Sequence, residues 1–434
     1  MTETPPPARA HPFRALRHTN FRLFFAGQLI SLIGTWMQQV AQSWLIYRLT
    51  KSSLLLGGIS FASQIPIFLL GAIGGHVADQ FDRRRVLLLT QTLSMILAGA
   101  LAALTLTGTI VEWHLFVLAA LLGIVNAFDI PARQSFLVQM VAREDLINAI
   151  ALNSSMFNGA RIVGPAVAGL LVAAIGEGWC FFANAVSYIA VLAGLLMMRL
   201  PRIAPITRAS LWTNIAEGFG FVARTAPVRA LLLLVGAVSF TAMPYSVLMP
   251  VFADQIFHSG ARGLGLLMGA AGSGALIGSI ALAMKASVKG LGRWVAIAAT
   301  TFGTALVFFA LSRHFALSVV VLTVAGGAMM VQMASSNTLV QSMVPDELRG
   351  RVMSVYSMMF MGMGPLGALL AGSIAERIGA PYTVAAGGAI TIIAALIFGL
   401  RLPALREPAR ALILAQQAGP TDPPQQTTAT GAEA

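Results

Sequence analysis

The chain has 434 residues, of which 57% are hydrophobic and 10% charged, and its 28 Lys and Arg against 16 Asp and Glu give a formal charge of +12. Ordinary globular domains carry about a quarter charged residues, so a soluble fold of this composition would lack the polar surface to cover itself. The basic residues are spread over many segments rather than gathered on one face, which argues against nucleic acid as the partner.

Twelve apolar stretches follow one another, and each is long enough to cross a bilayer, which takes about 20 residues. We predict an all-α membrane protein whose 12 transmembrane helices lie near residues 22–48, 54–79, 86–108, 114–138, 148–175, 178–198, 229–255, 263–285, 292–311, 316–341, 352–376 and 380–401. The connecting segments place 22 basic residues on one side and five on the other, namely Arg48, Lys51, Arg262, Arg313 and Arg377. Because short cytoplasmic loops retain Lys and Arg, both termini are expected in the cytoplasm.

The longest polar interval divides the spans into two sets of six. We expect five regions: a cytoplasmic N-terminal tail over 1–20, a six-helix bundle over 21–198, a cytoplasmic linker over 199–228, a second six-helix bundle over 229–402 and a disordered cytoplasmic tail over 403–434. Apolar residues at helical spacing in the linker predict an amphipathic helix on the membrane surface, and these are Leu211, Ile215, Phe219 and Val222.

The two sets of six echo each other. Gly164-Pro165 recurs 200 residues later as Gly364-Pro365, and a Leu-Val-Gln triplet at 137–139 recurs at 339–341. Two halves in parallel repetition are typical of transporters whose substrate site lies between the halves near the middle of the membrane. Proline removes a hydrogen bond from the helix, so the Gly-Pro pairs predict a pliant helix interface, with ordinary packing of small residues as the alternative.

A cluster of charge separates the second and third stretches, and it reads Gly75-His-Val-Ala-Asp79-Gln-Phe-Asp82-Arg83-Arg84-Arg85. Its three adjacent arginines assign this turn to the cytoplasm. A turn that only sets topology needs arginines but no aspartate at position 79. The spacing therefore favours a gate between helices over a purely topological turn.

These residues resemble the major facilitator superfamily, and within it the twelve-span drug/proton antiporter group that includes macrolide efflux proteins and enterobactin exporters. The likeness covers about residues 12–402 and rests on the charged turn and on segments 128–134 and 347–352, although Gln80 and Asp82 depart from the family pattern. It implies that Asp79 caps the cytoplasmic start of the eleventh helix when the cavity opens outward, and that Arg83 pairs with Asp129. The further gating candidates are Gly75, Arg84, Arg133, Gly164, Pro165, Gly364 and Pro365.

Polar groups deep in the spans are candidates for substrate contact, because they are costly in a membrane. By resemblance, the first, fourth, seventh and tenth helices line the cavity, and the fifth carries a lone arginine. The candidates are Gln38, Gln42, Asn126, Arg161, Tyr245, Gln332 and Asn337. Polar contacts between helices are the alternative for each of them. Arg161 would attract an anionic substrate such as a catecholate siderophore, unless it forms a structural ion pair.

The resemblance implies an exporter of small amphipathic molecules that works by alternating access and proton antiport. Asp129 is the candidate for proton coupling, uniport remains open, and a lipid or lysophospholipid translocator of the same fold is the alternative function. An enzyme is not expected, since the six histidines lie in tails or near span ends without a metal-binding or catalytic pattern. We expect no cofactor, metal or nucleic acid, a monomer, and the inner membrane of a bacterium, because 25 arginines against three lysines are typical of a GC-rich genome.

Overall fold

The computed structural model describes residues 13–199, 211–285 and 290–417, all in helices and short connections. The first part contains η1 (Arg14–Arg17), α1 (Thr19–Thr50), α2 (Ser53–Gln80), α3 (Arg83–Leu106), α4 (Glu112–Leu137), η2 (Arg143–Asp145), α5 (Leu146–Ile175) and α6 (Glu177–Met197). The second contains α7 (Leu211–Arg224), α8 (Ala226–Thr241), η3 (Met243–Ser246), α9 (Met249–Val251), η4 (Phe252–Ile256), α10 (Gly260–Ala283), α11 (Leu291–Leu311), α12 (Phe315–Met343), α13 (Asp346–Ser357), η5 (Met358–Gly362), α14 (Met363–Ile378) and α15 (Ala380–Gln417).

Eleven helical stretches among the described residues are long and apolar enough to cross a membrane. The expected first span is also a helix, α1, but it does not belong to these eleven. Its 32 residues include several glutamines, which lower its hydropathy. The membrane protein of many helices is thereby confirmed, while the count of 12 spans stays a prediction.

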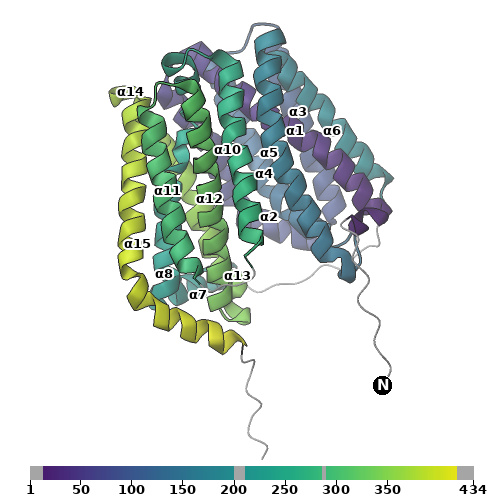
Figure 1. Cartoon of the computed structure of the whole chain (residues 1–434). Helices are drawn as coiled ribbons and strands as arrows, with labels where there is room; N and C mark the ends of the chain where they lie inside the picture. The colour runs from purple at the N-terminus through teal and green to yellow at the C-terminus, as the bar shows by residue number, and fades with distance from the viewer. Residues whose placement is uncertain (1–12, 200–210, 286–289, 418–434) are drawn as a thin grey trace, which may run out of the picture.

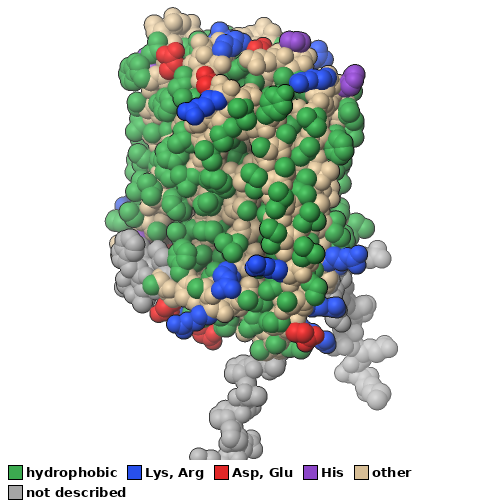
Figure 2. Space-filling model, turned by 90° about the vertical axis from the view of Figure 1, so that its left-hand side faces the viewer, with side chains coloured by type: hydrophobic (Ala, Val, Ile, Leu, Met, Phe, Trp, Pro, Cys, Tyr) green, Lys and Arg blue, Asp and Glu red, His purple; other side chains and the backbone are tan. Residues whose placement is uncertain are grey.

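The surface agrees with this reading. Figure 2 shows hydrophobic side chains over the middle of the molecule, whereas Lys, Arg, Asp and Glu gather toward its two ends. Many large apolar side chains on this surface are exposed, among them Phe308 and Leu400. An apolar belt between two charged rims is the surface expected of a protein surrounded by lipid.

The helices form two groups that meet along two seams. Helices α1–α6 pack among themselves, α8–α15 do the same, and the groups join mainly where α2 packs on α14 and α5 on α10. The described chain begins and ends at the same end of the molecule, which we call the termini end; the opposite one is the far end (Figure 1). Figure 1 shows α5 and α10 side by side near the far end and diverging toward the termini end.

Two turns at the far end display the internal repeat in the backbone. Gly176 ends α5 and Gly379 ends α14, and both have a φ of 89°. Only glycine adopts this left-handed region readily, and it allows each helix to reverse into the next within one residue. The two glycines stand 203 positions apart, close to the offset of the Gly-Pro pairs.

One expected boundary needs correction, the start of the disordered C-terminal tail at residue 403. The chain is helical through Gln417, because apolar residues of α15 beyond position 401 pack against the second helix group; residues 418–434 lie outside the described part. Near the other terminus, Arg14 and His18 both bind Asp145, so the segment after residue 12 is anchored. The helix expected in the linker is present as α7 and packs on α13, where Glu217 pairs with Arg351.

Candidate functional site

At the far end, glycines bring the two helix groups into backbone contact. A Cβ atom added to Gly57 of α2 would overlap the carbonyl oxygen of Ala368, and one added to Gly372 of α14 would lie 2.6 Å from the carbonyl oxygen of Ser53. On the other seam, a Cβ atom on Gly265 of α10 would lie 2.5 Å from the carbonyl oxygen of Pro165. Such close approach by small residues is the usual way in which membrane helices associate.

Polar contacts close the same end. Lys51 Nζ lies 2.7 Å from Asp254 Oδ2, and Glu376 Oε2 accepts hydrogen bonds from the backbone N–H groups of Ser53 and Leu54 at 2.7 and 3.1 Å. Each contact joins one helix group to the other. The far end is therefore held shut by charge as well as by packing.

The charged turn lies at the termini end and binds mainly within its own helix group. Asp79 faces Arg83 at 3.7 Å, and Arg83 also donates to the backbone carbonyls of Ala78 and Ser135. Arg84 donates to the carbonyls of Leu195 and Leu196 at the end of α6, at 2.7 and 2.8 Å. Arginines at a helix C-terminus satisfy carbonyls that lack a helical partner. These contacts tie α3 to α4 and α6.

Asp129 is the centre of a polar cluster between α3 and α4. It is 1% exposed, and its carboxylate accepts hydrogen bonds from Thr90 Oγ1 at 2.8 Å and Gln91 Nε2 at 2.7 Å. Arg133, one helical turn further along α4, forms its ion pair. In this conformation Asp129 pairs with Arg133 of the same helix. Its pairing with Arg83, which the resemblance implies for the state whose cavity opens outward, stays a prediction.

The glycines of the gating set differ in what surrounds them. Gly75 faces open space, whereas a Cβ atom on its neighbour Gly74 would overlap the carbonyl oxygen of Ala127 in α4. Gly164 packs against Trp36 of α1 in the same way. Close helix approach therefore requires Gly74, which the sequence reading passed over, and Gly164.

The two Gly-Pro pairs sit in different helices. Pro165 lies inside the continuous helix α5, next to its contact with α10. Pro365 follows the π-helical turn η5, which interrupts the eleventh expected span, and the nearest atom to an added Cβ on Gly364 is Ser239 Oγ at 3.7 Å. π-helical turns within helices are frequent at functional sites. The second pair therefore marks a break in its helix, whereas the first marks a packed contact.

Several cavity candidates are held inside one helix group. Gln38 is 7% exposed, and its side-chain oxygen accepts a hydrogen bond from Asn184 Nδ2 of α6 at 2.7 Å. Gln332 is fully buried and bonds weakly to Ser336 at 3.4 Å. Gln38 thus joins α1 to α6, whereas the hydrogen bond of Gln332 stays within its own helix, α12. Asn337 is half-buried and accepts from Gln341, and Gln42 and Asn126 are half-buried in α1 and α4.

Arg161 lies at the seam between the two helix groups. Its guanidinium, half-buried at the middle of α5, lies 5.8 Å from the ring centre of Trp36 in α1. A Cβ atom added to Gly272 of α10 would lie 3.0 Å from the Arg161 carbonyl oxygen, so α5 packs against the other helix group at this position. Within the described ranges, no carboxylate lies at ion-pair distance from Arg161. The structural ion pair expected as the alternative is therefore absent there.

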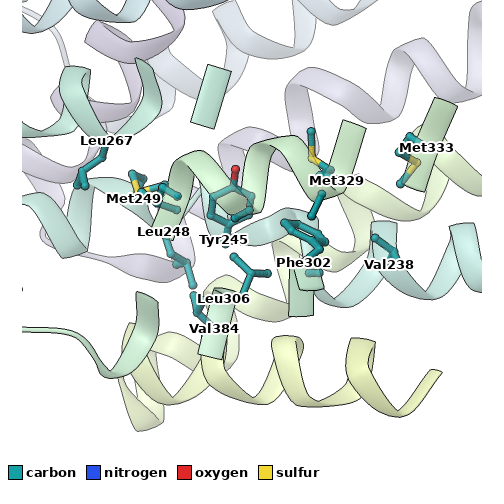
Figure 3. Close-up of a cluster of buried hydrophobic side chains, with 14 of the residues drawn as sticks. Val238, Tyr245, Leu248, Met249, Leu267, Phe302, Leu306, Met329, Met333 and Val384 are labelled. Carbon is teal, nitrogen blue, oxygen red and sulfur yellow. The ribbon is translucent and has the colours of Figure 1, made fainter. Parts of the chain in front are cut away.

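Tyr245 occupies a broken stretch of its span. Between α8 and α10 the backbone passes through η3, the single turn α9 and the π-helix η4, with Pro244 and Pro250 in the break. Its ring packs edge-on against Phe302 at 6.0 Å, and Figure 3 shows its hydroxyl directed away from Leu306 and Val384. Interrupted helices near the membrane midplane are typical of transporter binding sites.

The comparisons with known proteins agree with this arrangement. A family model described as "Transmembrane secretion effector" matches residues 10–419, nearly the whole chain. The chain belongs to this family. The resemblance to the major facilitator superfamily is thereby confirmed, and the protein is a membrane transporter rather than an enzyme.

Two curated relatives and one solved structure illustrate the match. The chain is 27% identical to the staphyloferrin A transporter of Staphylococcus aureus, over 87% of this chain and 95% of that protein. It is 28% identical to the multidrug efflux pump Tap of Mycolicibacterium fortuitum, over 86% and 93%. The crystal structure of the nucleoside transporter NupG superposes with a TM-score of 0.71 at 16% identity, over 89% of this chain and 98% of that one, which shows a shared fold.

Sequence reasoning missed Trp36, Glu376 and Gly74. No pattern in the sequence marked Trp36, since an aromatic residue in an apolar helix usually serves packing alone. Glu376 is an acidic residue near the end of an expected span, a position that could have marked it. Gly74 stands next to Gly75, the glycine of the family pattern, and only the packing of α2 on α4 shows that Gly74 is the one in close contact.

Proposed function

We propose that this transporter exports small amphipathic molecules of drug or siderophore type across the bacterial inner membrane, by alternating access coupled to proton antiport. The observation that carries the proposal is Arg161, which lies against Trp36 at the seam between the two helix groups and has no carboxylate partner among the described residues. A charge at this depth is costly unless it faces water or a ligand. The family and the printed functions of its relatives support transport of small molecules.

We base the proposed orientation on the basic residues. Among the described ones, Arg83 and Arg84 belong to the larger set of the sequence analysis, and their charged turn lies at the termini end. We assign that end to the cytoplasm, with both termini inside. The sealed far end then faces outward, so this conformation is the one that takes up substrate from the cytoplasm.

Arg161 favours substrates with an anionic group. Guanidinium binds carboxylates through two parallel hydrogen bonds, and the half-buried Trp36 offers flat apolar surface for an aromatic or aliphatic body. Tyr245 is 5% exposed and would reach a substrate only after helices move. Of the other candidates, Gln42, Asn126 and Asn337 are partly exposed. They complete the proposed cavity, while Gln38 and Gln332 would join it only after helices move.

Asp129 is the proposed proton-coupling group. Its carboxylate is buried with Arg133 in the half of α4 nearer the termini end. A proton on Asp129 would release Arg133, so protonation and helix movement would be linked. The further proposed gating residues are Asp79, Arg83, Arg84, Gly164 and Pro365, and the transporter is proposed to act as a monomer.

A lipid or lysophospholipid translocator is the second candidate. A largely apolar groove of about 590 Å³ lies between α11, α12 and α15 on the membrane-facing surface, and its lining includes Thr300, Thr304, Phe308 and Leu400. An acyl chain would fit such a groove. It lies apart from Arg161, however, so it supports lipid contact more directly than lipid transport.

The test is transport into liposomes that contain the purified protein, with three probes: an aromatic carboxylate, its neutral methyl ester and a lysophospholipid. The proposal predicts that the carboxylate is transported, that Arg161→Gln abolishes this, and that Arg161→Lys retains part of it. Arg313→Gln, which removes an exposed arginine at the far end, is the control. Transport of the lysophospholipid alone would favour the second candidate, and transport of none would refute both.

A further inference from the structure

The carboxylate of Glu376 caps a helix that belongs to the other helix group. Its Oε2 atom accepts from the backbone N–H groups of Ser53 and Leu54 and from the Ser52 hydroxyl at 3.1 Å. Ser53 is the first residue of α2, and Ser52 itself accepts from the N–H group of Leu55. The first turn of α2 is thus satisfied partly by its own N-cap and partly by a residue 323 positions away.

The first N–H groups of a helix have no helical partner, and the helix dipole makes its N-terminus attractive to an anion. Hydrogen bonds from N–H groups to a carboxylate are stronger than those between neutral groups. The three bonds to Glu376 therefore add appreciably to the closure of the far end. They break as soon as α2 and α14 separate there.

An ion pair at the same end also joins the two helix groups. Lys51, whose backbone adopts a left-handed φ of 51°, ends α1 and reaches Asp254 of the other helix group at 2.7 Å. Below both contacts, the backbones at Gly57 and Gly372 touch. Charged contacts thus lie at the surface of the seam, and glycine packing lies beneath them. Opening of the far end requires the charged contacts and the glycine contacts to separate.

We propose that Glu376 is the outer latch of the transport cycle, and that it mirrors the latch assigned to Asp79. α2 and the eleventh expected span, α13 to α14, run antiparallel, and each carries a carboxylate within its last few residues. Glu376 caps the start of α2 in the conformation described here. Asp79, near the end of α2, would cap the start of α13 when the far end opens.

The two caps are alternatives, because tilting α2 against its partner brings one pair of ends together and separates the other. The inference rests on the proposed alternating access. It adds that Glu376 stabilises the conformation closed at the far end. Weakening Glu376 should shift the population from the conformation closed at the far end toward the one that is open there.

The test measures distances between spin labels on the full-length protein in liposomes, in a Cys180→Ala background. One pair, Thr109→Cys with Arg313→Cys, spans the far end; the other, Ile147→Cys with Met284→Cys, spans the termini end, and all four positions are exposed. Glu376→Gln should raise the fraction with a long far-end distance by about tenfold, since it removes the charge from three hydrogen bonds. The termini-end distance should shorten in the same fraction.

Glu112→Gln is the matched control, because it removes an exposed carboxylate at the same end that begins a helix of its own group. If Glu376→Gln expresses poorly, Glu376→Asp keeps the charge but shortens the reach and should shift the distances in the same direction. Unchanged distributions in the folded variant would overturn the latch, even if transport persists. Shifted distances without transport of any probe would support the latch and refute the proposed function.

Discussion

Asp129→Asn separates the structural part of the polar cluster from its proposed role in coupling. The substitution keeps the shape of the side chain and an oxygen for Thr90 and Gln91, but it leaves Arg133 without its anionic partner. Removing one member of a buried ion pair costs about 3–5 kcal/mol. The side chain of Arg133 is 26% exposed, so water compensates in part and we expect a loss of about 2–3 kcal/mol.

The assay is reversible unfolding in mixed micelles, read for four proteins: unmodified, Asp129→Asn, Arg133→Gln and the double variant. Because the double variant has no uncompensated charge, it should regain most of the stability lost by Asp129→Asn. Proton flux should remain absent in both variants that lack Asp129. A double variant as unstable as the single one would refute the ion-pair account, and restored proton flux would refute the coupling role.

Three further tests, with five substitutions in all, concern the contacts between helices. Gly74→Leu should prevent normal folding while Gly75→Ala is tolerated, because only a side chain at position 74 meets the backbone of α4. Yield and thermal unfolding in detergent would show the difference. Equal behaviour of the two variants would contradict this explanation. Gly218→Leu should detach α7 from α13, since an added Cβ would lie 2.6 Å from the Arg351 carbonyl oxygen. Glu217→Gln should change the free energy of unfolding by less than about 1 kcal/mol, because the Glu217–Arg351 ion pair is exposed. Proteolysis near α7 would report both, and loss of docking in the second variant alone would refute this reasoning. Gln38→Leu leaves Asn184 without its partner and should cost about 1–3 kcal/mol with unchanged affinity for the carboxylate probe, so a selective loss of affinity would restore Gln38 to the binding site.

The membrane class was predictable from the sequence because composition and span length are imposed by the bilayer itself, whereas transport was predicted from the repeat and the family resemblance. The repeat was visible in the two Gly-Pro pairs, and the structure adds Gly176 and Gly379, which the same turn requires in both halves. The extension of α15 could not, because Pro403 and Pro408 are typical of a chain that leaves its helix. In the structure, packing against the second helix group outweighs them.

Side-chain roles were less predictable, because helical spacing gives the face of a residue but not its neighbour. Gln38 shares a face with other polar residues of α1, yet α6 covers it and supplies Asn184. Asp129 was assigned to Arg83 by resemblance, whereas Arg133 is nearer on the same helix. The cap formed by Glu376 joins residues more than 300 positions apart, and no local pattern encodes it.

The most direct measurement is substrate-dependent proton movement in liposomes that contain the purified transporter, with an aromatic carboxylate supplied on the side facing the termini end. The account predicts that the carboxylate moves toward the far-end side while protons move the opposite way, and that Asp129→Asn abolishes the proton signal. Movement of the carboxylate with no proton signal would contradict antiport, and no movement in either direction would contradict the proposed export.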